Sequence, residues 1–147
     1  MSASTTYSIL HDVEIDATCD RVFEAISEPS ELEKWWPLRC SGSAALGEVY
    51  NLCLSDQYDW LGKVSHFNPG KEFRIRMTKT EVHWRGTSFG FEILELPNGK
   101  VLLQFSHDGW TETNVSYRMT SYCWALLLKG LKDYIEKGVV LPFEDRA

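Results

Sequence analysis

The sequence is short of positive charge and has no long hydrophobic run, and both shortages restrict what the protein can do. Its 147 residues include 15 Lys and Arg against 21 Asp and Glu, a net charge of −6. Binding nucleic-acid phosphates needs a basic stripe, so no nucleic-acid partner is expected. The same balance disfavours docking on an anionic membrane surface, and no apolar stretch is long enough to cross a bilayer.

A C-x-x-C pair is also missing, because no two of the four cysteines, Cys19, Cys40, Cys53 and Cys123, have that spacing. Zinc ligands usually arrive in close pairs, so no metal site is expected. The first residues lack the basic region and apolar run of a signal peptide. Reduced thiols in a cytoplasmic protein are therefore the simplest interpretation. No repeat, linker or low-complexity segment interrupts the chain, which predicts one domain over residues 1–147.

Aromatic residues, by contrast, are abundant at 13% of the chain, with six Trp. Such side chains fill cores, but they also line apolar pockets and anchor interfaces. The segment ISEPSELEKWWP places Trp35 and Trp36 side by side before Pro37. Successive helical residues are about 100° apart, so the two rings cannot point the same way. Either one packs under the helices while the other reaches a cavity mouth, or both belong to the core.

Hydrophobic periodicity predicts an α+β fold. In YSILHDVEI, alternate residues from Tyr7 to Ile15, including His11, share one face of a strand. Two short helices follow, the first with Thr18 as its N-cap and the second between Pro29 and Pro37. After Gly42 the period becomes two, and turns such as PNG join antiparallel strands. A long helix over about residues 113–137 ends at Gly138, where a C-cap belongs.

Three stretches carry a resemblance to a known family: IDATCDRVFEAISEPSELEKWWP, GKVSHFNPGKEFRIR, and HDGW followed by YCWALLLKGLKDYIEKG. They resemble the START-like superfamily, also called SRPBCC or helix-grip, in the branch of the activator of heat-shock-protein-90 ATPase homologues. The resemblance implies a helix-grip fold, in which a curved antiparallel sheet of about six strands wraps around the long C-terminal helix. A cavity is expected where the sheet and the helix diverge.

Strand phase and helical spacing select the side chains expected to face that cavity. On the strand that ends in HDGW, His107 shares a face with Val101, Leu103 and Phe105, and His66 shares one with Trp60. His107 is either a proton-transfer or hydrogen-bonding group in an apolar pocket, or a histidine satisfied by a nearby backbone or hydroxyl group. The predicted ligand-cavity residues are Trp35, Trp36, Trp60, Val64, Phe73, Ile75, Phe89, Phe91, Phe105, His107, Trp124 and Leu128.

The leading functional hypothesis is therefore a non-catalytic or only weakly catalytic domain that binds a small hydrophobic or aromatic molecule. No catalytic residue, metal or cofactor is implied. The superfamily also includes polyketide aromatase/cyclase enzymes, and the resembled branch includes a cochaperone domain that stimulates a chaperone ATPase. Both remain alternatives, and the protein is expected to be a monomer or a homodimer.

Overall fold

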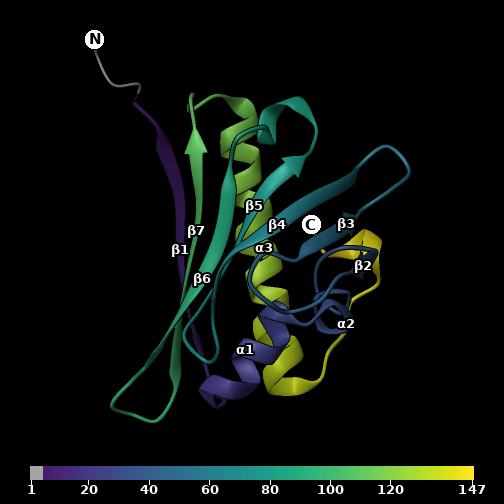
Figure 1. Cartoon of the computed structure of the whole chain (residues 1–147). Helices are drawn as coiled ribbons and strands as arrows, with labels where there is room; N and C mark the ends of the chain where they lie inside the picture. Colours follow the sequence, from purple (N-terminus) through teal and green to yellow (C-terminus); the bar gives the residue numbers. More distant parts are fainter. Residues whose placement is uncertain (1–4) are drawn as a thin grey trace.

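The computed structural model describes residues 5–147 (Figure 1). In chain order, its elements are β1 (Tyr7–Ile15), α1 (Cys19–Ser27), α2 (Pro29–Leu32), β2 (Arg39–Ser41), β3 (Val49–Cys53), β4 (Asp59–Asn68), β5 (Glu72–Lys79), η1 (Val82–Trp84), β6 (Ser88–Glu95), β7 (Val101–Trp110), α3 (Val115–Lys137) and η2 (Phe143–Asp145). The α+β class predicted from the sequence is confirmed.

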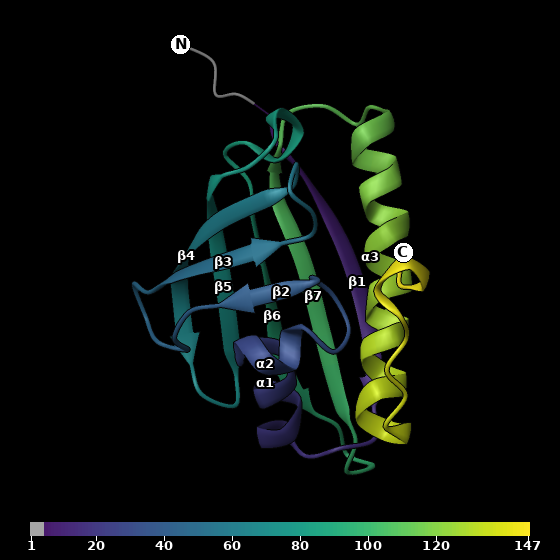
Figure 2. The same cartoon turned by 90° about the vertical axis from the view of Figure 1, so that its right-hand side faces the viewer.

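One antiparallel sheet contains all seven strands, in the order β1-β7-β6-β5-β4-β3-β2. The strand not predicted from the sequence is β2, whose three residues are too few to show a period of two. The helix α3 runs alongside β1, while the strands from β5 to β2 curve away from it (Figure 2). After Gly138 the chain turns back along α3 (Figure 2).

Side-chain caps fix where the helices begin. The hydroxyl of Thr18 accepts a hydrogen bond from the backbone N–H of Arg21, as predicted for the start of α1. The side chain of Asn114 accepts from Tyr117 N–H in the same way and starts α3. At the other end of α3, Gly138 has φ 70°, a left-handed conformation that glycine adopts without a Cβ clash.

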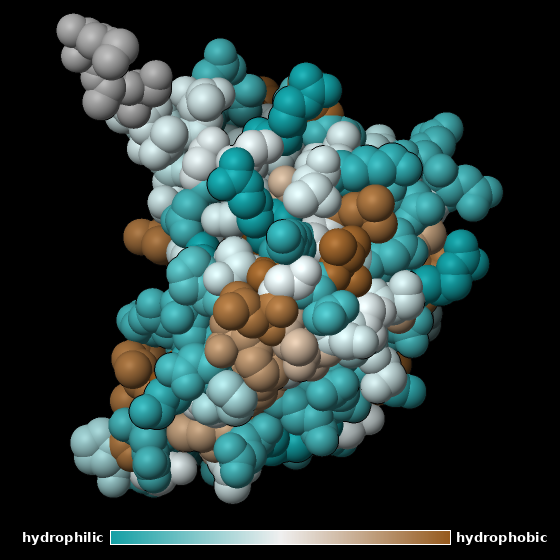
Figure 3. All heavy atoms as spheres, viewed as in Figure 1, coloured by the Kyte–Doolittle hydropathy of each residue, from teal (hydrophilic) through white to brown (hydrophobic). Residues whose placement is uncertain are grey.

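The inward faces of the strands form a core rich in aromatic side chains, while the opposite face is mainly hydrophilic, with hydrophobic residues in separate groups (Figure 3). A β-bulge between Val64 and His66 changes the phase of β4. The inward position predicted for His66 is therefore wrong: His66 is exposed, and Phe67 turns inward against Phe23 and Phe73. Tyr7 is likewise exposed, beyond a register shift in β1.

Two glycines test how tightly different parts of the fold are packed. A Cβ at Gly90 would lie 2.7 Å from the Phe73 carbonyl oxygen and 2.3 Å from Arg74 Cγ, whereas at Gly130 in α3 it would meet nothing within 4 Å. We expect Gly90→Ala to lower the free energy of unfolding by about 1–3 kcal/mol because the sheet must shift. Gly130→Ala should raise it by about 0.5–1 kcal/mol because alanine favours helix. Urea unfolding measures both, and a destabilising Gly130→Ala would contradict the open surroundings of that position.

Candidate functional site

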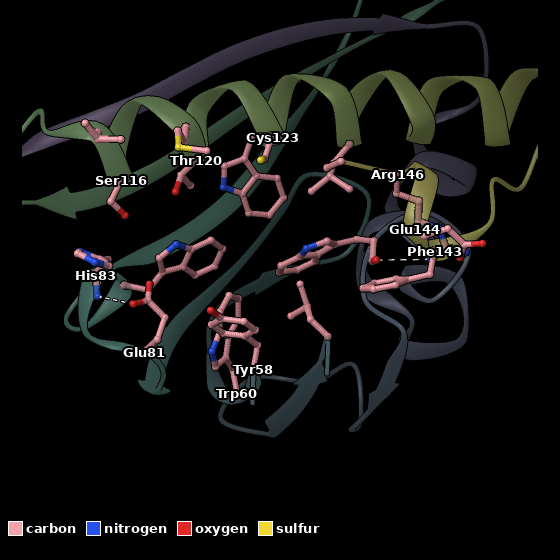
Figure 4. Close-up of a pocket in the computed structure, with 18 of the residues that line it drawn as sticks. Tyr58, Trp60, Glu81, His83, Ser116, Thr120, Cys123, Phe143, Glu144 and Arg146 are labelled. Carbon is pink, nitrogen blue, oxygen red and sulfur yellow. Dashed lines mark hydrogen bonds between the residues drawn. The ribbon is translucent and has the colours of Figure 1, made fainter. Parts of the chain in front are cut away.

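A cavity of about 850 Å³ lies between the N-terminal half of α3, η1, the segment after β3, and the chain after α3 (Figure 4). Aliphatic and aromatic side chains make up most of its wall, with polar groups at intervals. The lining residues are Trp36, Leu54, Tyr58, Trp60, Glu81, His83, Trp84, Asn114, Val115, Ser116, Met119, Thr120, Cys123, Trp124, Leu127, Phe143, Glu144, Arg146 and Ala147.

Four tryptophans from separate elements form a continuous part of this wall. The ring centroids of Trp60 and Trp84 are 4.5 Å apart, those of Trp84 and Trp124 are 6.1 Å apart, and those of Trp124 and Trp36 are 4.8 Å apart. All four side chains are buried, so each presents part of a ring to the cavity and packs its remainder against the core. Each of the four rings therefore packs against at least one other ring of the wall.

The adjacent tryptophans of the sequence do different things. The Nε1–H of Trp35 donates to the Ala25 carbonyl oxygen at 3.0 Å, which fastens the segment after α2 to α1. The ring centroid of Trp36 lies 6.3 Å from that of Trp35 and 5.2 Å from that of Phe89, and Trp36 also lines the cavity. Both rings belong to the buried core, as the second interpretation expects, and Trp36 borders the cavity as well. Control of ligand entry by Trp36 stays a prediction.

The predicted ligand-site residues fall into two groups. Trp36, Trp60 and Trp124 line the cavity. The other nine are buried in the core around it: Trp35, Val64, Phe73, Ile75, Phe89, Phe91, Phe105, His107 and Leu128. Contact of these twelve residues with a ligand remains a prediction.

Sequence reasoning missed one helix face and two short segments. Ser116, Thr120, Cys123 and Leu127 follow one another at helical spacing and line the cavity. That spacing was a usable signal, hidden because the more apolar face with Leu128 and Leu131 dominates the pattern. Residues of η1 and of the chain after Gly138 gave no signal, because segments of three residues show no period.

His107 is fully buried and has both ring nitrogens occupied. Trp124 Nε1–H donates to His107 Nδ1 at 3.1 Å, so His107 Nε2 carries the proton and donates to Thr87 Oγ1 at 2.9 Å. The Thr87 hydroxyl in turn donates to the Trp84 carbonyl oxygen. Burial, assisted by the charge of Arg74, lowers the pKa of His107 to about 3. Both ring nitrogens of His107 are therefore satisfied by hydrogen bonds, one of them to a hydroxyl, and the lowered pKa keeps the ring neutral at physiological pH.

The arginine that lines the cavity, Arg146, is already hydrogen-bonded to backbone carbonyl oxygens. Arg146 Nη1 donates to the Glu33 carbonyl oxygen at 2.7 Å, and its Nε donates to the Leu141 carbonyl oxygen at 3.0 Å. Its guanidinium also lies 5.9 Å from the ring centroid of Phe143. These contacts hold the last residues of the chain against the segment after α2, at one side of the cavity (Figure 4).

Residues 5–147 lack two kinds of feature. No helix in this range is long and apolar enough to span a membrane. No group of three or more His, Cys, Asp or Glu side chains in it is arranged to hold a metal ion.

The curved antiparallel sheet, the long C-terminal helix and the cavity beside it define a helix-grip domain of the START-like superfamily, as the sequence predicted. Within that class, the chain belongs to the family described as activator of Hsp90 ATPase homolog 1-like protein, which matches residues 16–136. No curated protein matches the chain.

Several solved structures are similar. The Aha1 dimer from Colwellia psychrerythraea has a TM-score of 0.81 and 26% identity, covering 90% of this chain and 98% of that one. CalU16 from Micromonospora echinospora has a TM-score of 0.73 and 19% identity, covering 88% and 74%. DynU16, described as a putative protein in the dynemicin biosynthetic locus, has a TM-score of 0.75 and 19% identity, covering 89% and 48%. The last two support the fold alone.

The depressed pKa of His107 predicts an acid-sensitive fold. The ordinary pKa is 6.5 and the folded value is about 3, so between these values only the unfolded chain binds the proton at this residue. The free energy of unfolding should therefore fall with decreasing pH below about 6.5, by about 1.4 kcal/mol per pH unit from this group. Urea unfolding from pH 7 to pH 4 should show a shallower fall for His107→Gln than for the wild type.

The matched control is His66→Gln, because His66 is an exposed histidine on the same sheet. It should retain the wild-type pH dependence. Equal slopes for His107→Gln and the wild type would contradict the buried neutral state of His107.

Proposed function

We propose that the protein binds a small hydrophobic or aromatic molecule in the cavity beside α3. The observation that carries this proposal is the wall itself, in which four tryptophans border about 850 Å³ of space instead of closing it. Pockets that bind small molecules are concave, mostly apolar and of this size, with a few polar groups that set orientation. Burying about 200 Å² of apolar ligand surface would contribute roughly 5 kcal/mol before the costs of association.

Family and chemistry support this assignment over catalysis. The START-like fold is built to leave space between sheet and helix, and His107, the proton-transfer candidate of the aromatase/cyclase alternative, is locked in a hydrogen-bonded chain. The four cysteines are free. A reducing compartment would keep them so, and we expect a cytoplasmic protein.

The neutral dye N-phenyl-1-naphthylamine, which fluoresces more strongly in apolar surroundings, tests the proposal. We expect saturable binding to the wild type. Cys123→Trp should weaken the affinity by at least about tenfold, a loss of ~1.4 kcal/mol, because the larger ring fills the cavity from the α3 side. Fluorescence titration measures the dissociation constants.

The matched control is Ala125→Trp, which adds the same ring to an exposed position of α3 outside the cavity lining. This variant should bind the dye as the wild type does. Absence of saturable dye binding to the wild type, or equal weakening by the two substitutions, would contradict the proposed site.

A second candidate function, protein interaction, is favoured by an exposed apolar stripe on α3, which starts at the rim of the cavity, where Val115 and Met119 also belong to the lining. Val115, Met119, Tyr122 and Leu126 follow one another at spacings of four, three and four, and are 70%, 62%, 67% and 40% exposed. Apolar residues at this spacing form the contact seam when two helices pair. The relative from Colwellia psychrerythraea is described as a dimer, so the partner we propose for this stripe is a second copy of the chain.

Sedimentation velocity tests the self-association. We expect a dimer for the wild type and a monomer for Tyr122→Glu, because a buried, unpaired carboxylate in the seam is costly. Lys63→Glu, which introduces a carboxylate at an exposed residue of β4 instead of α3, should remain dimeric. A wild-type protein that stays monomeric at every concentration tested would contradict this candidate.

A further inference from the structure

Three polar side chains line the end of the cavity nearest the start of α3. They belong to Glu81, Ser116 and Thr120, all of which line the cavity. In Figure 4 the Glu81 carboxylate points toward the two hydroxyls, which project from α3 on the facing side. From this arrangement we infer that the ligand of the proposed function is an apolar molecule carrying a primary ammonium group. The inference rests on that function and specifies its ligand class.

Each of the three groups has capacity to accept a hydrogen bond. One carboxylate oxygen of Glu81 accepts the backbone N–H of His83 at 2.9 Å, which fixes the side chain at the start of η1. Within residues 5–147, the second oxygen of Glu81 has no hydrogen-bonding partner, and neither hydroxyl bonds to another group. The spacing of four residues between Ser116 and Thr120 places them on successive turns of the same helix face.

The donor count of a primary ammonium group matches this set. An ionised carboxylate only accepts hydrogen bonds, a hydroxyl can accept them, and an ammonium group has three N–H donors and no acceptor. A neutral alcohol or amide could satisfy fewer of the acceptors. Hydrogen bonds in which both partners are charged are shorter and about twice as strong as neutral ones, so the pairing with Glu81 would contribute most.

The charges around the site favour a cation. Within the described part of the chain, no Lys or Arg forms an ion pair with Glu81. The Arg146 guanidinium is directed to backbone carbonyls, and the second lining carboxylate, Glu144, adds negative charge. The rings of Trp60 and Trp84 border the same space, and the faces of tryptophan rings attract cations.

The N-terminal end of α3 disfavours a bound cation. Its unpaired N–H groups carry a partial positive charge, with an effect of about 0.3–1 kcal/mol on a nearby ion. The Asn114 side chain already accepts the N–H of Tyr117, which satisfies part of that end. A full negative charge on Glu81 outweighs a partial one of opposite sign, so the cation remains the favoured ligand.

The test compares dansylcadaverine, a fluorescent primary amine with an aromatic body, with its uncharged N-acetyl derivative. We expect the wild type to bind the amine at least about tenfold more tightly than the acetylated form. Glu81→Gln keeps an oxygen for the His83 N–H but removes the charge, and should reduce this preference to about twofold or less. The affinity for the acetylated form should not change.

Glu144→Gln is the matched control, because it removes one charge from another part of the cavity lining and should reduce the preference much less than Glu81→Gln does. The double variant Ser116→Ala/Thr120→Val should lower the preference for the amine over the acetylated form in part. Equal binding of the two probes by the wild type, tighter binding of the acetylated form, or an equal loss in Glu81→Gln and Glu144→Gln would overturn the inference. If N-phenyl-1-naphthylamine still binds in those cases, the proposed function stands and only the amine assignment fails.

Discussion

The hydrogen bond from Trp124 to His107 is the constraint on which the rest of this structure depends. It joins α3 to β7 in the middle of the core, where both side chains are almost completely buried. Two polar groups in an apolar interior must satisfy each other, so the helix can sit at only one height and rotation on the sheet. Thr87 extends the chain of donors to the backbone of Trp84, which links η1 to the same anchor. The position of α3, the position of η1 and the gap between them therefore have a common origin.

The location of the cavity follows from that anchor and from the curvature of the sheet. Next to Trp124, the rings of Phe89, Phe91 and Phe105 fill the space between the sheet and α3. Toward the start of α3 the strands β3 and β4 have curved away, and the facing residues of the helix become small or polar, as at Ser116 and Cys123. Large rings on one side and short side chains on the other leave volume that the chain does not fill.

Most of the fold could be predicted from the sequence because period-two and helical patterns extend over nearly every long element. The inward phases of β5, β6 and β7 were predicted correctly, whereas the phase of His66 was not, because a bulge inserts one residue without changing composition. The residues that line the cavity were harder to predict from the sequence. A strand pattern shows that Phe91 and Trp60 both face inward, but only their distance from α3 decides which one borders open space. Glu81 lines the cavity opposite Ser116, which comes some 35 residues later in the chain, so local sequence patterns do not relate the two.

The placement of the tryptophans also makes the protein its own optical reporter. Of the six Trp in the chain, Trp36, Trp60, Trp84 and Trp124 border the cavity. In the series Trp60, Trp84, Trp124 and Trp36, successive ring centroids lie 4.5, 6.1 and 4.8 Å apart. Excitation can pass between rings at such distances, so the intrinsic ultraviolet emission is a collective property of the cavity wall. A molecule entering the cavity would change the surroundings of all four indoles at once. Its arrival could then be followed in the unlabelled protein.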